Sequence, residues 1–380
     1  MTAPYRIAVI GLGQRIAHVL AAMQEVGWPL ELAGYADPAP VGAPILAEAG
    51  IGKGESFDTA DALLAAGPFD LVMIGSPNHL HLEHLTRARA EGFPIFMEKP
   101  IVRTQEESFA LARTLDAAPP IYVGLVMRSM PIVRETLLRV HGGQIGKLVS
   151  IDATEHLHPA HGGYLARNWR RKQAWGGSYL LDKVCHDFDI FNALIGARAA
   201  RVASFGGRSI FDASNTARDA LYDYQDTGWG GADDAFASGM DVTDHQVALA
   251  EYANGVRLSF HSNTSTALME RRWYIAGTEG TIIADLVRNR LMVRRVGDGG
   301  KPERIDFGER TADLHNGADQ AMARDLRAAL DGAAPFPVTP RDSLEAGLVV
   351  MAIDEAMEKR SVVECAPMWT AFDQARAHVR

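Results

Sequence analysis

YRIAVIGLGQRIAHVLAAM, residues 5–23, combines a strand, a glycine turn and a helix in the order typical of a phosphate-binding unit. Residues 5–10 form a compact run rich in β-branched side chains, and this run ends at Gly11. Apolar side chains then recur at helical spacing, at Ile16, Val19, Leu20 and Met23. Gly11 allows a tight turn, and Gly13 lets the backbone approach a pyrophosphate at the N-terminus of the helix. The stretch therefore predicts a dinucleotide-binding domain.

Three residues after the second glycine complete the expected cofactor turn, namely Gln14, Arg15 and Ile16. Ile16 occupies the position where this pattern usually has glycine or alanine, so that the helix can pack closely on the strand. A branched side chain at this point predicts looser packing.

The next apolar run, LELAGYAD, ends at Asp37 and predicts the second strand. A carboxylate there accepts hydrogen bonds from the adenosine ribose and repels a 2′-phosphate. Pro38 follows it, with no arginine or lysine close behind. The sequence therefore favours NAD over NADP, although an aspartate that only opens a turn before proline has the same geometry.

Two further strand ends carry polar residues. Residues 70–74 predict a buried strand followed by the turn Gly75, Ser76, Pro77, Asn78, and residues 94–97 predict another strand followed by Glu98, Lys99 and Pro100. In a parallel sheet, ligands bind at the carboxyl ends of the strands. We therefore expect both turns at the cofactor edge, with Lys99 as a functional residue rather than a solvated charge.

Residues 176–196, GGSYLLDKVCHDFDIFNALIG, predict an amphipathic helix with Asp182, His186 and Asp189 recurring on one face. This row favours His186 as a general base whose tautomer and cation are stabilised by Asp182. An ordinary solvated polar face is the alternative.

The bulk composition is that of a soluble globular protein. The length of 380 residues predicts two domains, here placed at 1–125 and 126–380. A net charge of −9 argues against nucleic acid as a partner, and two cysteines allow neither a disulfide framework nor a metal-binding pair. Neither a signal segment nor a membrane span is evident, so a cytoplasmic location is expected.

An ordered set of motifs resembles the glucose–fructose oxidoreductase / inositol dehydrogenase (Gfo/Idh/MocA) family along nearly the whole chain. The matching stretches are IAVIGLGQR, SPNHLHLEH, FMEKPI, YVGLVMRSMPIV, QIGKLVSI, GGSYLLDKVCHDFD, GTEGTI and HNGAD. The resemblance implies an α/β protein with an N-terminal Rossmann domain. It also implies a C-terminal α+β domain with a large, mostly antiparallel open sheet, often packed on another subunit. A homodimer or homotetramer is therefore expected.

The resemblance also assigns roles to single residues. Lys99 matches the lysine that contacts nicotinamide ribose and substrate hydroxyl, Asp182 matches the family aspartate, and His186 matches its proton acceptor. His81 and Glu98, within the matching motifs, are expected among the cofactor-binding residues. Lys183 is expected either to bind substrate or to pair with Asp187 at i+4, the pairing being slightly favoured.

The second half contributes the expected substrate contacts Arg128, His156, Trp169 and Lys183. Arg128 begins a helix whose Ile132, Val133, Leu137 and Leu138 are expected to face inward. His156 and His158 alternate on a strand, but no third ligand accompanies them, so a metal site is not expected. Trp169, in a basic and aromatic stretch, would cover a sugar ring or the nicotinamide; a solvated basic loop is the alternative.

Residues 209–244 hold eight aspartates without a regular period and predict a loop insertion, either a lid or a subunit-contact arm. Residues 246–262 and 272–296 alternate as antiparallel strands that need cover on both faces. His315 and Asp319 are expected to start a helix rather than to catalyse.

These features favour an NAD-dependent oxidoreductase that oxidises a secondary hydroxyl of a sugar, sugar derivative or cyclitol. One alternative is a redox-neutral, glycoside-cleaving enzyme that keeps a tightly bound NAD. The other is a non-catalytic sugar-sensing regulator.

Overall fold

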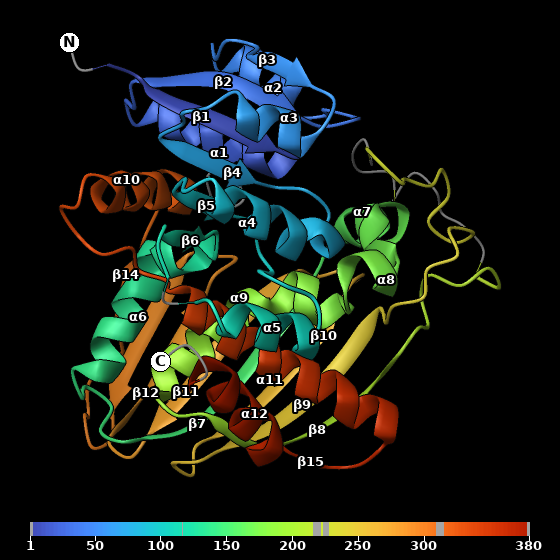
Figure 1. Cartoon of the computed structure of the whole chain (residues 1–380). Helices are drawn as coiled ribbons and strands as arrows, with labels where there is room; N and C mark the ends of the chain where they lie inside the picture. The colour runs from blue at the N-terminus through green and yellow to red at the C-terminus, as the bar shows by residue number, and fades with distance from the viewer. Residues whose placement is uncertain (1–2, 116, 216–221, 223–227, 309–314, 378–380) are drawn as a thin grey trace.

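Two β-sheets, one above the other in Figure 1, organise the chain. The computed structural model describes residues 3–115, 117–215, 222, 228–308 and 315–377. Together the sheets give the α/β architecture expected, with a Rossmann-like parallel sheet followed by a mixed, mostly antiparallel sheet.

The first sheet has six parallel strands in the order β3-β2-β1-β4-β5-β6. Its strands are β1 (Tyr5–Ile10), β2 (Leu30–Ala36), β3 (Glu55–Phe57), β4 (Leu71–Ile74), β5 (Ile95–Met97) and β6 (Ile121–Val123). The accompanying helices are α1 (Gln14–Glu25), α2 (Ala43–Glu48), α3 (Ala60–Ala65), the 3₁₀ turn η1 (Asn78–Leu80), α4 (His81–Ala90) and α5 (Gln105–Ala112). Strands β4, β5 and β6 are buried at every position, as expected for parallel strands covered on both faces.

Ile16 packs closely after all. Its side chain is buried, and a Cβ built on Gly75 would lie 2.1 Å from Ile16 Cγ1. The helix therefore keeps close contact with the sheet because the glycine on the neighbouring turn makes room for the branched side chain. The looser packing predicted from this position is not observed.

The second sheet has nine strands in the order β14-β13-β12-β11-β7-β10-β9-β8-β15, and among its adjacent pairs only β7 and β10 run parallel in the described part of the chain. Its strands are β7 (Leu148–His156), β8 (Ala199–Gly207), β9 (His245–Tyr252), β10 (Arg257–Asn263), β11 (Glu270–Gly277), β12 (Gly280–Asp285), β13 (Arg290–Arg295), β14 (Glu303–Asp306) and β15 (Val363–Glu364). The remaining helices are η2 (Val126–Ser129), α6 (Pro131–His141), α7 (Pro159–Arg167), η3 (Trp169–Arg171), α8 (Gln173–Gly176), α9 (Tyr179–Ile195), α10 (Ala318–Leu330), α11 (Pro340–Lys359) and α12 (Ala366–Ala377).

Helix α9 is the central element between the two sheets (Figure 1). Ser178 caps its N-terminus by accepting the Leu181 backbone N–H at 3.0 Å, and Gly196 ends it in the left-handed conformation at φ 66°. Most of its side chains are buried, including the polar Asp182, His186 and Asp187. A helix that buries charged groups on several faces needs a partner for each of them, and these partners build the site.

The orientation predicted for α6 is partly wrong. Ile132 and Val133 are buried as expected, but the same face continues with Thr136 and Val140. Leu138, two residues after Thr136, lies on the opposite side of the helix and is 68% exposed.

The C-terminal helices connect the two halves. Helix α10 packs against α1, and α12 packs against α5. The boundary between residues 125 and 126 thus stays a prediction, because the last helices of the chain lie on the first domain.

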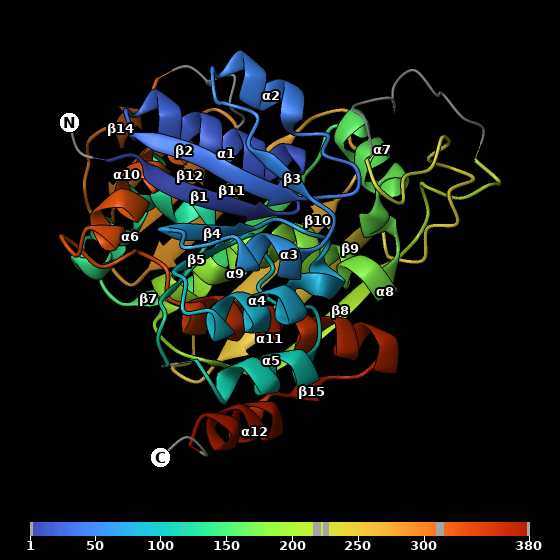
Figure 2. The same cartoon turned by 45° about the horizontal axis from the view of Figure 1, so that its top comes forward.

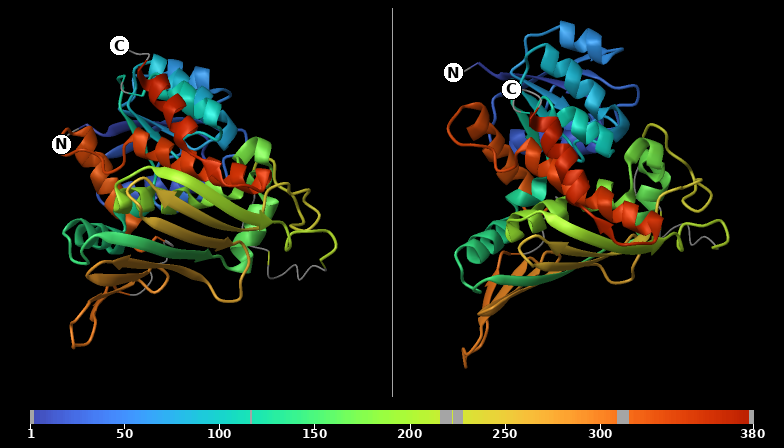
Figure 3. Two further views of the ribbon diagram at one scale, coloured as in Figure 1. Left: turned by 90° about the horizontal axis from the view of Figure 1, so that it is seen from below. Right: turned by 60° about the horizontal axis from the view of Figure 1, so that its bottom comes forward.

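One face of the second sheet carries α9 and α11, whereas Figure 3 shows no helix over the other face in the part of the chain that is described. Apolar side chains lie on this open face: Phe205, which is 76% exposed, stands opposite Val247, and Leu249 is 52% exposed. Throughout the described ranges, every helix is too short or too polar to cross a membrane.

Candidate functional site

The glycine turn after β1 forms a cradle that a side chain would fill. Gly11 has φ +83°, and a Cβ on it would lie 2.3 Å from the Ser76 backbone nitrogen. Gly13 precedes the first turn of α1, where no side chain caps the helix. Such an open helix N-terminus suits the negative charge of a pyrophosphate. The turn therefore fits a dinucleotide.

The cavity beside this turn, the cofactor cleft, has a volume of about 390 Å³. Its lining includes most of the predicted cofactor residues: Gly11, Gly13, Gln14, Arg15, Asp37, Ser76 and Pro77. Ile16 lies in the core instead. The Asp37 side chain is half-buried and accepts the Ala39 backbone N–H at 2.6 Å, and burial raises the pKa of its carboxyl group. Its place at the end of β2 suits a ribose hydroxyl.

A second cavity of about 360 Å³, the reaction cavity, continues from the cofactor turn towards α9. The structure brings Lys99, Asp182 and His186 together in its lining. The same lining contains Asn78, Glu98 and His81, which the sequence predicted as cofactor residues.

His186 is the least satisfied group in this cavity. Its side chain is buried, and its Nδ1 atom has no hydrogen-bond partner among the described residues. Burial, followed by the positive charges of Lys99 and Arg271, holds the pKa of His186 well below its ordinary value. At neutral pH the imidazole is therefore uncharged and able to accept a proton.

The predicted contact between the Asp182 carboxylate and the His186 ring is not observed. The Asp182 carboxylate instead accepts from Arg170 Nε at 3.1 Å and from Asn78 Nδ2 at 3.0 Å. Burial alone would raise the pKa of Asp182, but Lys99 and Arg170 outweigh it and keep that pKa below its ordinary value. Asp182 therefore connects α9 to the turn after β4, through Asn78, and to η3, through Arg170.

The Lys99 side chain contacts the backbone of the same helix, α9. Its Nζ atom donates to the Asp182 carbonyl oxygen, and its own backbone N–H contacts Glu98 Oε2 at 3.3 Å. The ammonium group is thus held at the wall of the cavity that contains His186.

Asp189 does not join the row. It is buried and accepts two hydrogen bonds from Arg128, at 2.6 and 2.9 Å. Seven helical residues separate Asp189 from Asp182, which is about 10 Å along the axis. Arg128 is therefore a structural ion-pair partner, and the prediction that it contacts substrate is not supported.

Arg15 links the two halves of the chain. It binds Glu98 at 3.2 Å and Asp319 at 2.5 Å, and Asp319 in turn contacts His315 Nδ1 at 2.8 Å. Burial would raise the pKa of Asp319, but Arg15 holds it well below the ordinary value. Asp319 lies in the first turn of α10, as expected, yet it also fixes this helix to the cofactor turn.

His81 and Trp169 both lie beside the cofactor turn, and their predicted contacts to cofactor and substrate stay predictions. Both ring nitrogens of His81 face backbone carbonyl oxygens, of Pro100 at 2.7 Å and of Ser76 at 2.9 Å, so the ring joins the two strand-end turns. Trp169 is buried in the wall of the cofactor cleft, with the Arg170 guanidinium 4.2 Å from its ring centroid.

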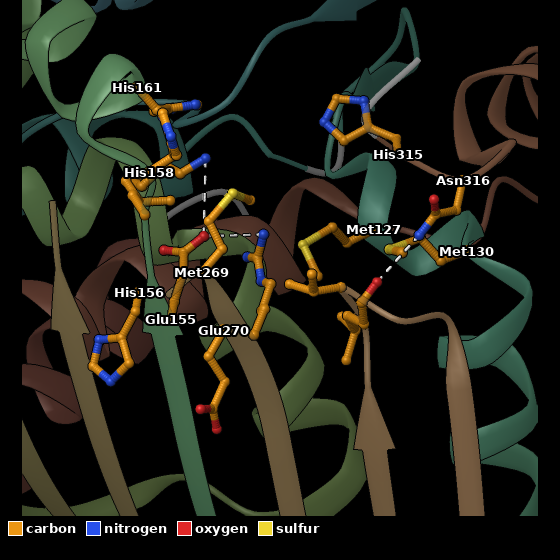
Figure 4. A pocket seen from close by; sticks show the side chains of 15 residues that line it. Met127, Met130, Glu155, His156, His158, His161, Met269, Glu270, His315 and Asn316 are labelled. Carbon is orange, nitrogen blue, oxygen red and sulfur yellow. Dashed lines mark hydrogen bonds and ion pairs between the residues drawn. The ribbon is translucent and has the colours of Figure 1, made fainter. Parts of the chain in front are cut away.

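A third cavity of about 290 Å³, the side cavity, adjoins the reaction cavity and is drawn in Figure 4. The two cavities share His161, Lys183 and His315 in their linings. The lining of the side cavity includes the thioether side chains of Met127, Met130 and Met269, and the Glu155 and Arg271 side chains. In Figure 4, Glu155 and Met269 stand on one side of the cavity, and Met127 and Met130 stand on the other.

Lys183 pairs with a residue that sequence reasoning missed. Its Nζ lies 3.8 Å from Glu155 Oε1, which Arg271 also contacts at 3.1 Å. Asp187, the partner expected for Lys183, binds Arg271 instead. Glu155 is buried, and its second oxygen, Oε2, has no partner in the described structure. The strand alternation of residues 148–156 was the signal that could have identified it.

That alternation also corrects His156. Glu155 faces the helix side of the sheet, so the next residue points to the open side. There the His156 ring packs edge-on against His261, with the centroids 4.9 Å apart, and Figure 4 shows the His156 ring pointing away from the Glu155 carboxylate. His156 belongs to the lining of the side cavity and not to that of the reaction cavity, so its contact to substrate stays a prediction. His158 caps α7 by accepting the Ala160 backbone N–H at 3.2 Å.

Residues 228–244, within the segment whose role was open, reach the cofactor cleft. Gly228 and Trp229 belong to its lining. No cluster of three potential metal ligands occurs in the ranges that the structure describes.

Comparison with known proteins gives two family models. "Oxidoreductase family, NAD-binding Rossmann fold" matches residues 5–123, and "GFO/IDH/MocA C-terminal domain" matches residues 134–283. The inositol 2-dehydrogenase of Rhizobium meliloti is 24% identical over 94% of this chain and 98% of its own length.

One further sequence relative and one solved structure are also similar to this chain. The 2,7-anhydro-N-acetylneuraminate hydratase of Mediterraneibacter gnavus is 25% identical over 60% of this chain, and the match spans only 54% of that relative. The structure of a levoglucosan dehydrogenase in complex with NADH and levoglucosan shares the fold, with a TM-score of 0.76 and 23% identity over 95% of this chain and 99% of the other.

Proposed function

The chain belongs to the Gfo/Idh/MocA family of NAD-binding oxidoreductases, and from this premise we propose that it oxidises a secondary hydroxyl of a sugar, sugar derivative or cyclitol with NAD. The observation that carries the proposal is the buried, uncharged imidazole of His186, which lines the same cavity as Lys99. A base and a cation beside a dinucleotide cleft are what removal of a hydroxyl proton requires.

The chain's own residues prepare the reaction. Bound NAD supplies the hydride acceptor. His186 takes the proton from the substrate hydroxyl, and Lys99 stabilises the negative charge that develops on that oxygen. Asp182 keeps Asn78 and Arg170 in place, and Arg15 fixes the cofactor turn against α10.

The side cavity would hold the part of the substrate beyond the oxidised carbon. Glu155 and Asn316 lie in its lining, and one oxygen of each, Oε2 and Oδ1, is buried without a partner among the described residues. Carboxylate and amide side chains of this kind accept hydrogen bonds from substrate hydroxyl groups. The methionine side chains of the lining offer an adaptable apolar surface near them. This combination supports a glycoside or another sugar with an apolar substituent over a bare cyclitol.

A substrate panel tests the proposal. Monosaccharides, cyclitols, and alkyl and aryl glycosides are incubated with enzyme and NAD, while reduced nicotinamide is followed by absorbance. We expect NADH to accumulate with at least one sugar or cyclitol. Binding of these compounds without any turnover would instead support a sugar-sensing regulator.

One observation favours a second candidate, a redox-neutral enzyme that oxidises and re-reduces its substrate on a retained NAD. A matched relative is named a hydratase, a reaction type with no net oxidation. In the same panel, glycoside cleavage without net NADH would identify this reaction.

Asp37 should set the choice of cofactor. We expect the wild-type protein to bind NAD more tightly than NADP. Asp37→Asn should lower the affinity for NAD by about 10- to 100-fold, the contribution of hydrogen bonds to a charged group. The difference in affinity between NAD and NADP should become smaller, because the negative charge that repels the 2′-phosphate is gone. Calorimetric titration of both cofactors measures this, with the exposed Glu48→Gln as control. If the wild-type protein bound NADP as tightly as NAD or more tightly, Asp37 would not be the ribose-binding acid.

The open face of the second sheet would pair with a second copy of the chain. Phe205, Val247 and Leu249 form an apolar surface there, and burial of such a surface stabilises a dimer or tetramer. We expect multi-angle light scattering to give at least a dimer at micromolar concentration. Leu249→Glu should shift the mass towards the monomer. A monomeric wild-type protein would contradict the proposal.

A further inference from the structure

Residues 228–244 form a strap from the C-terminal half that reaches the cofactor cleft of the first domain. Figure 2 shows this yellow segment beside α7 and α8. Gly228 and Trp229 line the cofactor cleft together with Asp37 and Val41. A Cβ built on Gly228 would lie 3.4 Å from Val41, so the backbone of the strap is in close contact with the rim of the cleft.

The strap is fastened to the basic stretch after α7. Arg171 donates to the carbonyl oxygens of Gly230 at 2.5 Å and Ser238 at 3.0 Å. Ala232 and Arg167 exchange two hydrogen bonds, and the Asp241 carboxylate accepts the Gln173 backbone N–H at 2.7 Å. The basic residues of this stretch thus hold the strap, rather than forming a solvated loop.

The base of the strap is equally well held. The buried carboxylate of Asp244 accepts the backbone N–H groups of Ser209, Ile210 and Phe211, at 2.7 to 3.0 Å. A small apolar cluster adds to this, and it consists of Leu157, Leu165, Ala166, Tyr179, Phe211, Ala235, Met240 and Val242. Trp229 therefore belongs to a segment that hydrogen bonds and apolar packing hold against the rest of the protein.

The Trp229 ring is placed for stacking. Its centroid lies 5.2 Å from that of Trp175 and 5.8 Å from that of His79, the latter at an interplanar angle of 29°. Even so, 40% of the residue stays exposed. The neighbouring residues of the cleft, Asp37 and Val41, are those that follow β2, where the adenosine half of a dinucleotide binds.

We propose that Trp229 is a cofactor-binding residue that closes the adenosine end of the cleft and slows the release of NAD. The inference rests on NAD binding as proposed above. An aromatic ring on a held segment offers an adenine base a stacking partner at little entropic cost, because the residues around it are already ordered. The strap then acts as a retention device on the cofactor and leaves the reaction cavity untouched.

Dissociation kinetics test this. NADH is bound to the wild-type protein, to Trp229→Ala and to Trp229→Phe, then displaced by excess NAD in a stopped-flow instrument that follows NADH emission. Truncation to alanine should raise the dissociation rate roughly 5- to 150-fold, the range for loss of one base–aromatic stack. Phenylalanine should restore most of the slow release. Calorimetry with two fragments locates the contact: ADP-ribose should bind the alanine variant more weakly, and nicotinamide mononucleotide should bind it equally.

Val296→Ala, which truncates an exposed side chain after β13, is the matched control and should release NADH like the wild type. Melting curves without cofactor show that each variant is folded. An unchanged dissociation rate in Trp229→Ala, or an equal loss for both fragments, would overturn the proposal. A wild-type protein that binds no NADH would instead refute NAD binding itself, so the two failures are distinguishable.

Discussion

Replacing His186 with alanine is expected to lower turnover by about 10²- to 10⁴-fold, the usual contribution of a positioned general base. His186 is buried and uncharged at neutral pH, because burial and the cations around it depress its pKa. Its loss removes the proposed acceptor of the hydroxyl proton. Part of the activity should return at high pH, where hydroxide or a deprotonated substrate takes over. Steady-state rates across a pH series, read from NADH absorbance, measure both effects.

A matched control is His141→Ala, since His141 lies exposed at the C-terminal end of α6. It should leave turnover and the pH profile unchanged, and NADH affinity should stay close to the wild-type value in both variants. Near-normal turnover of His186→Ala at neutral pH would assign the base to another group, with Lys99 the first candidate.

Lys99→Ala should lower kcat by about 10²- to 10³-fold, the usual cost of removing one preorganised group that stabilises an oxyanion. NAD affinity should fall only modestly, because the ammonium matters most when negative charge develops. A second effect concerns pH. After burial, Lys99 is the largest influence that lowers the pKa of His186. Without this cation the pKa of His186 rises, so the base becomes protonated at a higher pH and the acidic limb of the activity profile moves upward.

The exposed Lys53→Ala variant, which removes one positive charge elsewhere, serves as the control for net charge. It should shift neither kcat nor the acidic limb. If Lys99→Ala lost turnover with an unmoved acidic limb, Lys99 would not act on His186 electrostatically, and its part in the reaction would be limited to the substrate oxygen.

Much of the fold was accessible from the sequence because its signals are local. The run of residues 5–10, the glycine at position 11 and the stripe of α1 specify a strand, a turn and a helix without reference to distant residues. The same holds for α9, where Ser178 and Gly196 mark both ends. Helix phase is a weaker signal: Leu138 is as apolar as Leu137, but only the position of the neighbouring elements leaves Leu137 partly buried and Leu138 exposed.

The candidate site was accessible in part. Lys99 and His186 follow from strand-end position and helix spacing, and both line the reaction cavity. The partners of buried charges could not be predicted, since Asp182 finds Arg170 and Asp189 finds Arg128 through tertiary packing. Glu155 was not predicted because a buried glutamate on a strand needs partners from other elements, here Lys183 and Arg271, which only tertiary packing supplies.

The pair formed by Ile16 and Gly75 has a consequence for how this sequence can change over time. The Ile16 side chain occupies the space that a side chain at position 75 would need, so only one of the two positions can carry a large residue. Any side chain at 75 is incompatible with isoleucine at 16, and a small residue at 16 first opens a void that a side chain at 75 could later fill. Substitutions here are therefore ordered: position 16 must shrink before position 75 grows, and the reverse path passes through a clash.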